Sequence, residues 1–395
     1  MHVDLNSCFA TVEQQAHPHL RGKPLVIAAY TTPNGCIVAP SIEAKKYGIK
    51  VGMTVRDARL LYKDVIVRSP DPQLIRDVHI RFVKIFKSYS PFVYPKSIDE
   101  VVVEFKEAPS FKKGLVNIGY EIKKRLRSEV GEWISCNIGI ATNRFLAKLA
   151  SSLHKPDGLD VITYKNLIDT YSSVSLVDLN GINTRYEARL NANGIFNPID
   201  FLNSKERYLR KNVFKSIVGH YWHLRLRGWE TDDAEIKRKS FGQDFAIGKK
   251  TSDPRELSRI LMKLCEKMGR RLRAVGSEAF GLHLGLLYDD WIYWHKSKKF
   301  NGQAYTTEDL FRRAMWIFNM QPQRKKVVKI SVSCFGLIPS KISQMSLFDI
   351  EDKKRKVSDV MDLINDRYGE FVITPALMMN MKKLVLDRIA FGSTE

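Results

Sequence analysis

The sequence predicts an α+β chain made of several domains. Apolar runs typical of strands alternate with helical periodicity over about the first 160 residues. From Leu167 to about Arg227 the periodicity is helical only, and a polar stretch from Thr231 then leads into a second mixed region. A chain of 395 residues has room for about two to four domains.

The first mixed region is a close succession of strands and helices. Its long helix is well marked because Asp71 is a good N-cap, and Ser7 is read in the same way as the cap of the first helix. The helix that contains Lys123 is expected to keep that side chain on its polar side. In chain order the predicted elements are a strand over 1–5, a helix over 8–15, a strand over 24–30, a short helix over 41–47, a long helix over 71–89, two strands within 92–105 with Asp99 and Glu100 between them, a helix over 114–130, a strand over 134–140 and a helix over 143–153.

The helical region contains a tight turn with glycine between two helices. The turn runs over 178–183 and includes Gly181, and a second glycine, Gly194, follows the next helical stretch. Backbone N–H groups in such a turn can bind a phosphate without reading base sequence. An ordinary helical hairpin would show the same pattern, and both interpretations stay open.

The second mixed region predicts a small α+β domain. Its elements are a strand around 245–247, a helix over 254–275 and strands over 278–288 and 327–335. The helix carries Lys263, Lys267, Arg270, Arg271 and Arg273, which either bind nucleic acid or only solvate one helix face. Beyond Ile338 the chain is polar and basic and ends with one more predicted helix.

The charge balance narrows the class of partner. The chain has 64 Lys+Arg against 43 Asp+Glu, a formal net charge of +21, which points to nucleic acid or an anionic surface. Five scattered cysteines without C-x-x-C spacing fit neither a disulfide framework nor a zinc site. The start is no signal peptide and no apolar run approaches membrane-spanning length, so we expect a cytoplasmic protein with no membrane partner.

Three carboxylates from distant parts of the chain stand at predicted strand ends. Asp4 follows the first strand, and Asp99 and Glu100 lie in Ser-Ile-Asp-Glu before an apolar run. Carboxylate oxygens of this kind suit Mg²⁺, and two such ions can clamp the attacking and leaving oxygens of a displacement at phosphorus. The pattern predicts a site for two divalent cations that acts on phosphates, against the alternative of acidic residues that merely cap strand ends.

Six short motifs in order make the chain resemble a Y-family (translesion) DNA polymerase of the DNA polymerase IV type. The resemblance covers nearly the whole length and is reinforced by the turn at Gly181. The motifs are Val-Asp-Leu-Asn-Ser-Cys-Phe over 3–9, Leu-Arg-Gly-Lys-Pro over 20–24, Glu-Ala-Lys-Lys-Tyr-Gly over 43–48, Ser-Ile-Asp-Glu over 97–100, Ile-Gly-Ile-Ala-Thr-Asn over 138–143 and Lys-Pro-Asp-Gly over 155–158.

The resemblance implies a right-hand polymerase architecture with an additional C-terminal domain. The implied domains are a palm over 1–8 and 71–163, fingers over 9–70, a helical thumb over 164–231, a linker over 232–239, an α+β little finger over 240–338 and a tail over 339–395. It also implies a monomer that binds primer-template DNA and deoxynucleoside triphosphates (dNTPs). No exonuclease domain is visible, so low fidelity without proofreading is expected.

The resemblance also assigns roles to individual residues. The catalytic carboxylates are Asp4, Asp99 and Glu100, and the backbone carbonyl of Leu5 completes a shell for two Mg²⁺ ions. Phe9 would exclude a ribose hydroxyl from the incoming nucleotide, although a core aromatic is the simpler alternative. The remaining implied contacts are Cys8, Lys45 and Lys155 to the nucleotide, and Gly181 and Gly194 to the DNA backbone.

Five positions depart from the family pattern. Lys45 stands where arginine is usual, Ile42 replaces a tyrosine, Ala39 a hydroxyl residue, Asn6 an aspartate and Asn183 the second glycine of the thumb turn. These changes bear on nucleotide affinity and on the grip of the thumb on DNA, and they leave the metal ligands intact.

The tail carries a separate signal. Gln344-Met-Ser-Leu347-Phe348 resembles the peptide with which bacterial polymerases bind the β-type sliding clamp. A Gln and a Leu-Phe pair on an extended segment can anchor in an apolar groove. The alternative is a tail that packs back on its own protein.

The sequence therefore predicts a template-directed translesion DNA polymerase. One rival is a catalytically inactive, polymerase-like accessory protein that binds the clamp, yet all three carboxylates are present. A second rival is a helix-turn-helix repair glycosylase or nuclease built on the Gly181 turn. It would leave the first mixed region unexplained.

Overall fold

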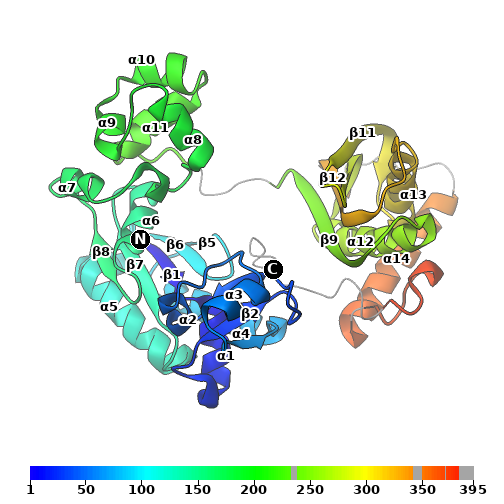
Figure 1. Cartoon of the computed structure of the whole chain (residues 1–395), viewed down its shortest axis with the longest axis horizontal. Helices are drawn as coiled ribbons and strands as arrows, with labels where there is room; N and C mark the ends of the chain where they lie inside the picture. The colour runs from blue at the N-terminus through cyan, green and yellow to red at the C-terminus, as the bar shows by residue number, and fades with distance from the viewer. Residues whose placement is uncertain (233–237, 341–348, 370, 382–395) are drawn as a thin grey trace. The chain divides into compact units, whose positions relative to one another are not determined.

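The computed structural model describes residues 1–232, 238–340, 349–369 and 371–381 (Figure 1). These residues form two compact units, within 1–232 and within 238–381. Within them, no helix combines the length and the apolar character that crossing a membrane requires. The predicted multidomain α+β class is confirmed.

The first unit is built on a five-stranded sheet of order β5-β6-β1-β7-β8. The central strand β1 runs antiparallel to both neighbours, and its register sets Asp4 opposite Glu100. Glu100 is therefore the first residue of β6, where the sequence had placed it in a turn. The strands are β1 His2–Leu5, β5 Phe92–Pro95, β6 Glu100–Glu104, β7 Cys136–Ile140 and β8 Leu159–Val161.

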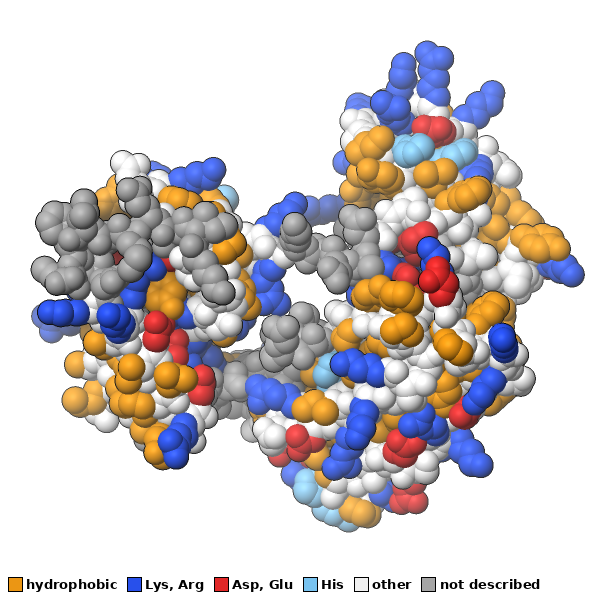
Figure 2. Space-filling model, turned by 180° about the vertical axis from the view of Figure 1, so that it is seen from behind, with side chains coloured by type: hydrophobic (Ala, Val, Ile, Leu, Met, Phe, Trp, Pro, Cys, Tyr) orange, Lys and Arg blue, Asp and Glu red, His pale blue; other side chains and the backbone are white. Residues whose placement is uncertain are grey.

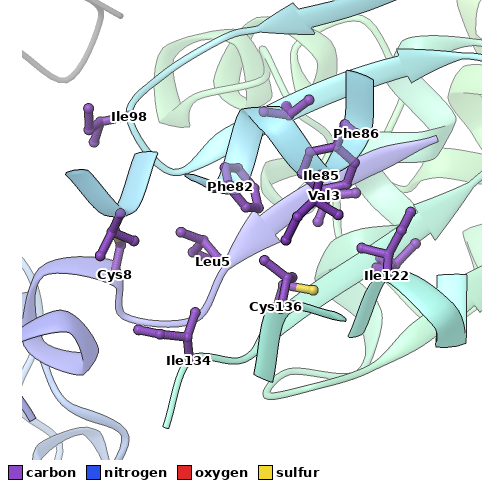
Figure 3. Close-up of a cluster of buried hydrophobic side chains, with 14 of the residues drawn as sticks. Val3, Leu5, Cys8, Phe82, Ile85, Phe86, Ile98, Ile122, Ile134 and Cys136 are labelled. Carbon is purple, nitrogen blue, oxygen red and sulfur yellow. The ribbon is translucent and has the colours of Figure 1, made fainter. Parts of the chain in front are cut away.

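Helices cover both faces of this sheet. On one face, α4 and α5 pack on side chains such as Val3 and Ile138, and Figure 3 shows Val3 and Leu5 of β1 near Phe82 and Phe86 of α4. The predicted cap Asp71 accepts hydrogen bonds from the backbone N–H groups of Gln73 and Leu74. The helical segments around this core are α1 Cys8–Ala16, η1 Pro18–Leu20, α4 Pro72–Lys87, η2 Pro109–Lys113, α5 Leu115–Arg125 and the π-helical turn η3 Leu126–Val130.

On the other face, α6 (Arg144–Leu153) lies directly against β7. A side chain at Gly139 would place its Cβ 1.9 Å from the carbonyl oxygen of Ala147, so only glycine permits this approach. Because side chains alternate along a strand, His2 and Asp4 lie on the α6 face while Val3 and Leu5 lie in the core. The close packing brings side chains of α6 within reach of His2 and Glu100.

A small three-stranded sheet of order β3-β2-β4 completes this part of the unit. Ser41 caps α2, and Thr54 and Asp57 form a capping box at α3. Strands β3 and β4 and helix α3 had not been predicted, because their apolar runs are short. The elements are β2 Leu25–Ala28, β3 Ile37–Pro40, α2 Ile42–Lys46, α3 Val55–Leu61 and β4 Ile66–Arg68.

Two local predictions in the first unit are wrong. Ser7 has φ of 48° and its side chain makes no cap hydrogen bond, so α1 begins without the expected serine cap. Lys123 lies buried, because its ammonium group donates to the Asp157 carboxylate at 3.0 Å and to the carbonyl of the same residue.

The rest of the first unit is the helical region, with its own core around Phe201 and Trp222. Gly181 has φ of +99°, a value that favours glycine. The Asn183 side chain caps α8 by accepting a hydrogen bond from the Tyr186 N–H. The backbone of Asn183 has φ of −101°, so this position does not need the glycine expected from the family pattern. The elements are α7 Leu167–Ser172, η4 Leu176–Asp178, α8 Thr184–Asn191, α9 Pro198–Asn203, α10 Glu206–Tyr208, the π-helical turn η5 Leu209–Val213 and α11 Val218–Leu226.

The second unit is a four-stranded antiparallel sheet of order β11-β10-β12-β9 that packs on α12 and α13. The sequence missed β11 and α13, since β11 is largely polar and exposed. The elements are β9 Ser240–Thr251, α12 Pro254–Ala274, β10 Ser277–Tyr288, β11 Tyr293–Ala304, α13 Thr307–Phe318 and β12 Val327–Pro339.

The described part of the predicted tail packs on the second unit. It comprises α14 (Asp349–Tyr368) and η7 (Ala376–Met378), and Phe371 and Met378 join the core beside α12. The Lys263 ammonium donates to the Met381 carbonyl at 2.7 Å, and Arg273 pairs with Asp362. Lys263 and Arg273 therefore bind other residues of the same unit. The sequence analysis had expected them either to bind nucleic acid or to solvate a helix face. The predicted clamp segment 344–348 lies outside the described residues.

Candidate active site

A cavity of about 560 Å³ opens in the first unit at the end of β1. The loop after β1, the start of α1 and the residue before β6 meet there with α2 and the turn after α6. The residues that line it are Asp4, Leu5, Asn6, Ser7, Cys8, Phe9, Val38, Ala39, Pro40, Ile42, Lys45, Lys46, Val51, Asp99, Glu100, Lys155 and Pro156. The cavity thus gathers every residue predicted to be catalytic, metal-binding or nucleotide-binding.

Strand pairing explains why the carboxylates meet. The antiparallel register of β1 and β6 sets Asp4 beside Glu100, and the Leu5 N–H donates to the Asp99 carbonyl at 2.9 Å. Asp4 stands nearly a hundred residues before Asp99 and Glu100 in the sequence. The strand pairing brings all three carboxylates to one cavity.

Asp99 is the carboxylate whose ionisation is disfavoured. Burial raises its pKa, and the neighbouring charges of Asp4 and Glu100 raise it further, while a hydrogen bond from the Ser97 hydroxyl at 2.6 Å opposes them. Burial and the same acidic surroundings raise the pKa of the Cys8 thiol well above its usual value. The cavity is therefore a place where negative charges repel one another and a cation is needed.

Glu100 is held in its ionised form. Burial acts to raise its pKa, but the nearby His2 imidazole and the hydrogen bonds and charge of Lys148 outweigh burial and bring the pKa to about 2. The Lys148 ammonium donates to both Glu100 oxygens, at 2.9 and 2.7 Å, and His2 Nε2 lies 3.7 Å from Oε2. Asp4 is paired in a similar way with the ammonium group of Lys155.

The donor set fits a hard divalent cation. Across the described ranges, no group of three or more His, Cys, Asp or Glu side chains is already assembled around one point. Asp4 and Glu100 each pair with a lysine, and the charges of both raise the pKa of Asp99. The three carboxylates would offer oxygen ligands of the kind that Mg²⁺ prefers.

The cationic side of the cavity is formed by three lysines, Lys45, Lys46 and Lys155. Burial lowers the pKa of Lys45, the charge of Lys155 lowers it further, and Asp4 opposes both. Two ammonium groups that destabilise each other beside carboxylates make a site suited to an anion such as a polyphosphate.

Phe9 is both a core residue and a residue of the cavity wall, the two alternatives that the sequence left open. It lies in the first turn of α1, is only 3% exposed and belongs to the core cluster, and it also lines the cavity. Ala39 and Ile42 line the same cavity with apolar side chains, so they add no side-chain hydrogen-bonding group to it. The Asn6 amide donates to the Ser135 hydroxyl and accepts from Asn137, which ties it to the neighbouring strand.

The two glycines predicted to bind the DNA backbone are in the helical region, away from this cavity. Both have positive φ, +99° at Gly181 and +72° at Gly194, and a Cβ at Gly194 would meet nothing within 4 Å. Exposed basic residues are also found in this region, and Figure 2 shows Lys and Arg side chains projecting from its end at the upper right. Around α10 and η5 they are Lys205, Arg207, Arg210, Lys211 and Lys215.

Sequence reasoning missed Lys148 and His2. Lys148 sits in the middle of α6 with no motif around it that signals a role, and His2 is one residue of a buried strand. Only the register of β1 with β6 and the packing of α6 at Gly139 bring both to Glu100.

The raised pKa of Asp99 predicts a stability change that depends on pH. A carboxyl whose pKa is higher in the folded state favours folding only below its unfolded pKa of about 3.9, so ionised Asp99 costs stability at neutral pH. We expect Asp99→Asn to raise the melting temperature at pH 7 in a chelating buffer, with the gain vanishing as the pH falls toward 4.

The control for this prediction has the opposite sign. Hydrogen bonds within the α3 capping box lower the pKa of Asp57, so this carboxylate stabilises the fold above its unfolded pKa. Asp57→Asn should therefore lower the melting temperature at pH 7. Equal shifts for both variants would contradict the electrostatic picture of the cavity.

Comparison with known proteins places this fold and cavity in one family. The impB/mucB/samB family matches residues 3–152, and its C-terminal domain matches residues 238–347. DNA polymerase IV of Pelotomaculum thermopropionicum is 28% identical over 98% of this chain and 96% of its own length. DNA polymerase IV of Moorella thermoacetica is 29% identical, with 95% of each chain covered.

Solved structures agree on the fold. A Y-family DNA polymerase chimera superimposes with a TM-score of 0.73 at 23% identity, covering 86% of this chain and 98% of the chimera. An insertion ternary complex of Dbh DNA polymerase gives a TM-score of 0.59 at 22% identity, with the same coverage.

The chain belongs to the impB/mucB/samB family, the Y-family DNA polymerases of the DNA polymerase IV (DinB) type. The family predicted from the six motifs is confirmed, and so is the enzyme class, a DNA-directed DNA polymerase.

Proposed function

We propose that this chain performs translesion synthesis, the template-directed addition of deoxynucleotides to a primer 3′-hydroxyl, including opposite damaged template. The single observation that supports it most is the cavity at the end of β1. It combines three carboxylates, three lysines and a buried aromatic ring in one space. Nucleotidyl transfer needs charge neutralisation and alignment rather than covalent participation by the protein, and these side chains supply both.

The carboxylates of Asp4, Asp99 and Glu100, with the Leu5 carbonyl, would hold divalent cations, and we propose two Mg²⁺ ions. Such ions, when bound, supply Lewis-acid activation of the attacking hydroxyl and charge neutralisation at the leaving phosphate. The protein contributes the fixed positions of its carboxylates, which the β1–β6 pairing sets before any ligand arrives.

Lys45 and Lys155 would bind the triphosphate of the incoming dNTP. The two ammonium groups repel each other in the free protein. A bound polyanion would offset this repulsion, so the repulsion favours binding of the triphosphate. Phe9 would pack against the sugar and exclude a 2′-hydroxyl, and Cys8 lies beside it in the same wall. Ala39 and Ile42 leave fewer polar contacts to the triphosphate than the family pattern provides.

The remaining parts would bind primer-template DNA. We propose that the palm is 1–8 and 71–163, the fingers 9–70, the thumb 164–231 and the little finger 240–338, with a linker over 232–239. Gly181 and Gly194, with the exposed basic residues around α10, would contact the DNA backbone without reading sequence. We further propose a monomer that works in the cytoplasm with low fidelity and without proofreading.

A primer-extension assay tests the proposed function. The parent chain should add dNTPs to a primer on undamaged template and should continue past a template abasic site that stops a replicative polymerase. Extension on undamaged template with a complete stop at every lesion tried would contradict translesion synthesis while leaving polymerase activity in place.

We also propose that the segment Gln344 to Phe348 binds a β-type sliding clamp. The support is the sequence alone, because this segment lies outside the described residues. Burying a Leu and a Phe side chain contributes roughly 1.5–3 kcal/mol each, so Leu347→Ala with Phe348→Ala should weaken clamp binding about 100-fold or more. Tethering acts through effective concentration, so synthesis without the clamp should be unchanged.

Calorimetry with the purified clamp, and extension with and without loaded clamp, measure this effect. Val357→Ala with Val360→Ala is a matched control, since it removes exposed apolar side chains from α14 nearby. Equal clamp binding by the segment variant and the parent would show that another surface is the tether.

A further inference from the structure

We propose that Lys148 is a positioning residue for the reaction. It fixes the Glu100 carboxylate without lining the cavity itself, so that the carboxylate can bind a cation there. The inference rests on the proposed function of Glu100 as a metal ligand. It begins with a bidentate contact, in which the Lys148 ammonium donates to both Glu100 oxygens at 2.9 and 2.7 Å. A contact to both oxygens fixes the rotation of the carboxylate as well as its position.

The contact is part of a ring of polar groups that stays open at one point, because His2 Nε2 makes no hydrogen bond to Glu100. His2 Nε2 lies 3.7 Å from the second Glu100 oxygen, and His2 Nδ1 is 3.1 Å from the Ser151 hydroxyl. The Ser151 hydroxyl donates back to the Lys148 carbonyl at 2.8 Å, one turn away on α6. His2 and Ser151 are each only 2% exposed, so the ring is anchored in the protein interior.

The members of the ring other than Glu100 are not part of the cavity lining. Glu100 lines the cavity, but Lys148, Ser151 and His2 do not. Lys155 differs, because it lines the cavity and reaches Asp4 from inside it. Lys148 therefore holds the Glu100 carboxylate from outside the cavity lining, whereas Lys155 stands inside the cavity, where a cation would approach Asp4.

The two lysines should therefore affect metal binding in opposite directions. Partners that orient a metal ligand from the second layer typically change metal affinity by about 10–100-fold when they are removed. We expect Lys148→Met to weaken binding of Mn²⁺ by about that factor. Lys155→Met removes a competing charge and should tighten Mn²⁺ binding about fivefold.

The experiment measures Mn²⁺ binding to the full-length chain by electron paramagnetic resonance, without DNA or nucleotide. Lys148→Arg can still hold both oxygens and should recover most of the affinity. Ser151→Ala removes the hydroxyl that joins His2 to the Lys148 carbonyl, and it should also weaken Mn²⁺ binding. This second variant keeps the test available if Lys148→Met fails to fold. In single-nucleotide extension, Lys148→Met should lower kcat and leave the nucleotide KM unchanged.

Each outcome decides the inference. Weaker Mn²⁺ binding by Lys148→Met with recovery by Lys148→Arg supports it. Unchanged or tighter binding by Lys148→Met, with a parent that binds normally, overturns the positioning role and leaves the proposed function standing. If the parent itself took up no Mn²⁺, the protein groups alone would hold no ion and this inference would be wrong, while primer extension would still test the proposed function.

Discussion

Asp99→Ala should abolish primer extension while the variant still binds primer-template DNA. The carboxylate lines the cavity beside two others, and the charges of Asp4 and Glu100 both raise its pKa. Removing one preorganised charge from a site that works by charge stabilisation lowers kcat by about 100- to 1,000-fold. DNA binding should persist, because the exposed basic residues that attract the DNA backbone are elsewhere.

Glu100→Gln tests the same site with less change of shape. It keeps the volume and hydrogen-bonding length but removes the charge that Lys148 holds, so it should lose activity to a similar extent. Glu129→Ala is the matched control, since Glu129 is an exposed carboxylate paired with Arg125. Single-turnover extension and fluorescence-anisotropy DNA binding separate catalysis from affinity. An Asp99→Ala variant within tenfold of the parent would remove Asp99 from the catalytic set.

Phe9→Ala should let ribonucleotides enter the site. The ring lines the cavity from the first turn of α1, and its loss opens volume where a 2′-hydroxyl would otherwise collide. Pocket contacts of this size discriminate by about 10–200-fold, so the preference for deoxyribonucleotides should fall by a similar factor. The measurement is the ratio of kcat/KM for matched deoxyribo- and ribonucleoside triphosphates.

The same ring is also part of the core, which the test must take into account. Phe9 is 3% exposed, and truncation of a buried Phe to Ala typically costs about 3–5 kcal/mol of stability. Phe82→Ala is a matched control, because Phe82 is fully buried in the same cluster and does not line the cavity. If both variants changed sugar preference equally, or neither did, Phe9 would be a core residue without a role in sugar choice.

The active-site cavity was largely predictable because its residues stand in short motifs. Asp4, Phe9, Asp99 and Lys155 each have neighbours in sequence that mark them, and the fold only had to bring the motifs together. Long periodic helices such as α4 and α12 were predictable for a related reason, since their apolar stripes repeat over several turns. Short or polar elements such as β4 and β11 carry too few periodic positions to be found.

Other features depend on contacts that no local pattern contains. Lys123 looks like a surface lysine until Asp157 is placed beside it, and the basic residues of α12 look solvent-exposed until α14 and the following residues pack on them. Lys148 is the clearest case. Its role depends on the β1–β6 register and on a glycine in β7 that lets α6 approach the sheet.

The measurement that tests the central claim most directly is incorporation of one matched dNTP by the parent chain as divalent cations are removed and restored. The cavity of about 560 Å³ contains three carboxylates, whose oxygens suit a hard cation. We predict no incorporation in the presence of a chelator and full recovery when Mg²⁺ is returned in excess. Undiminished incorporation in the chelator, or none under either condition with DNA bound, would contradict the assignment of this cavity as the polymerase active site.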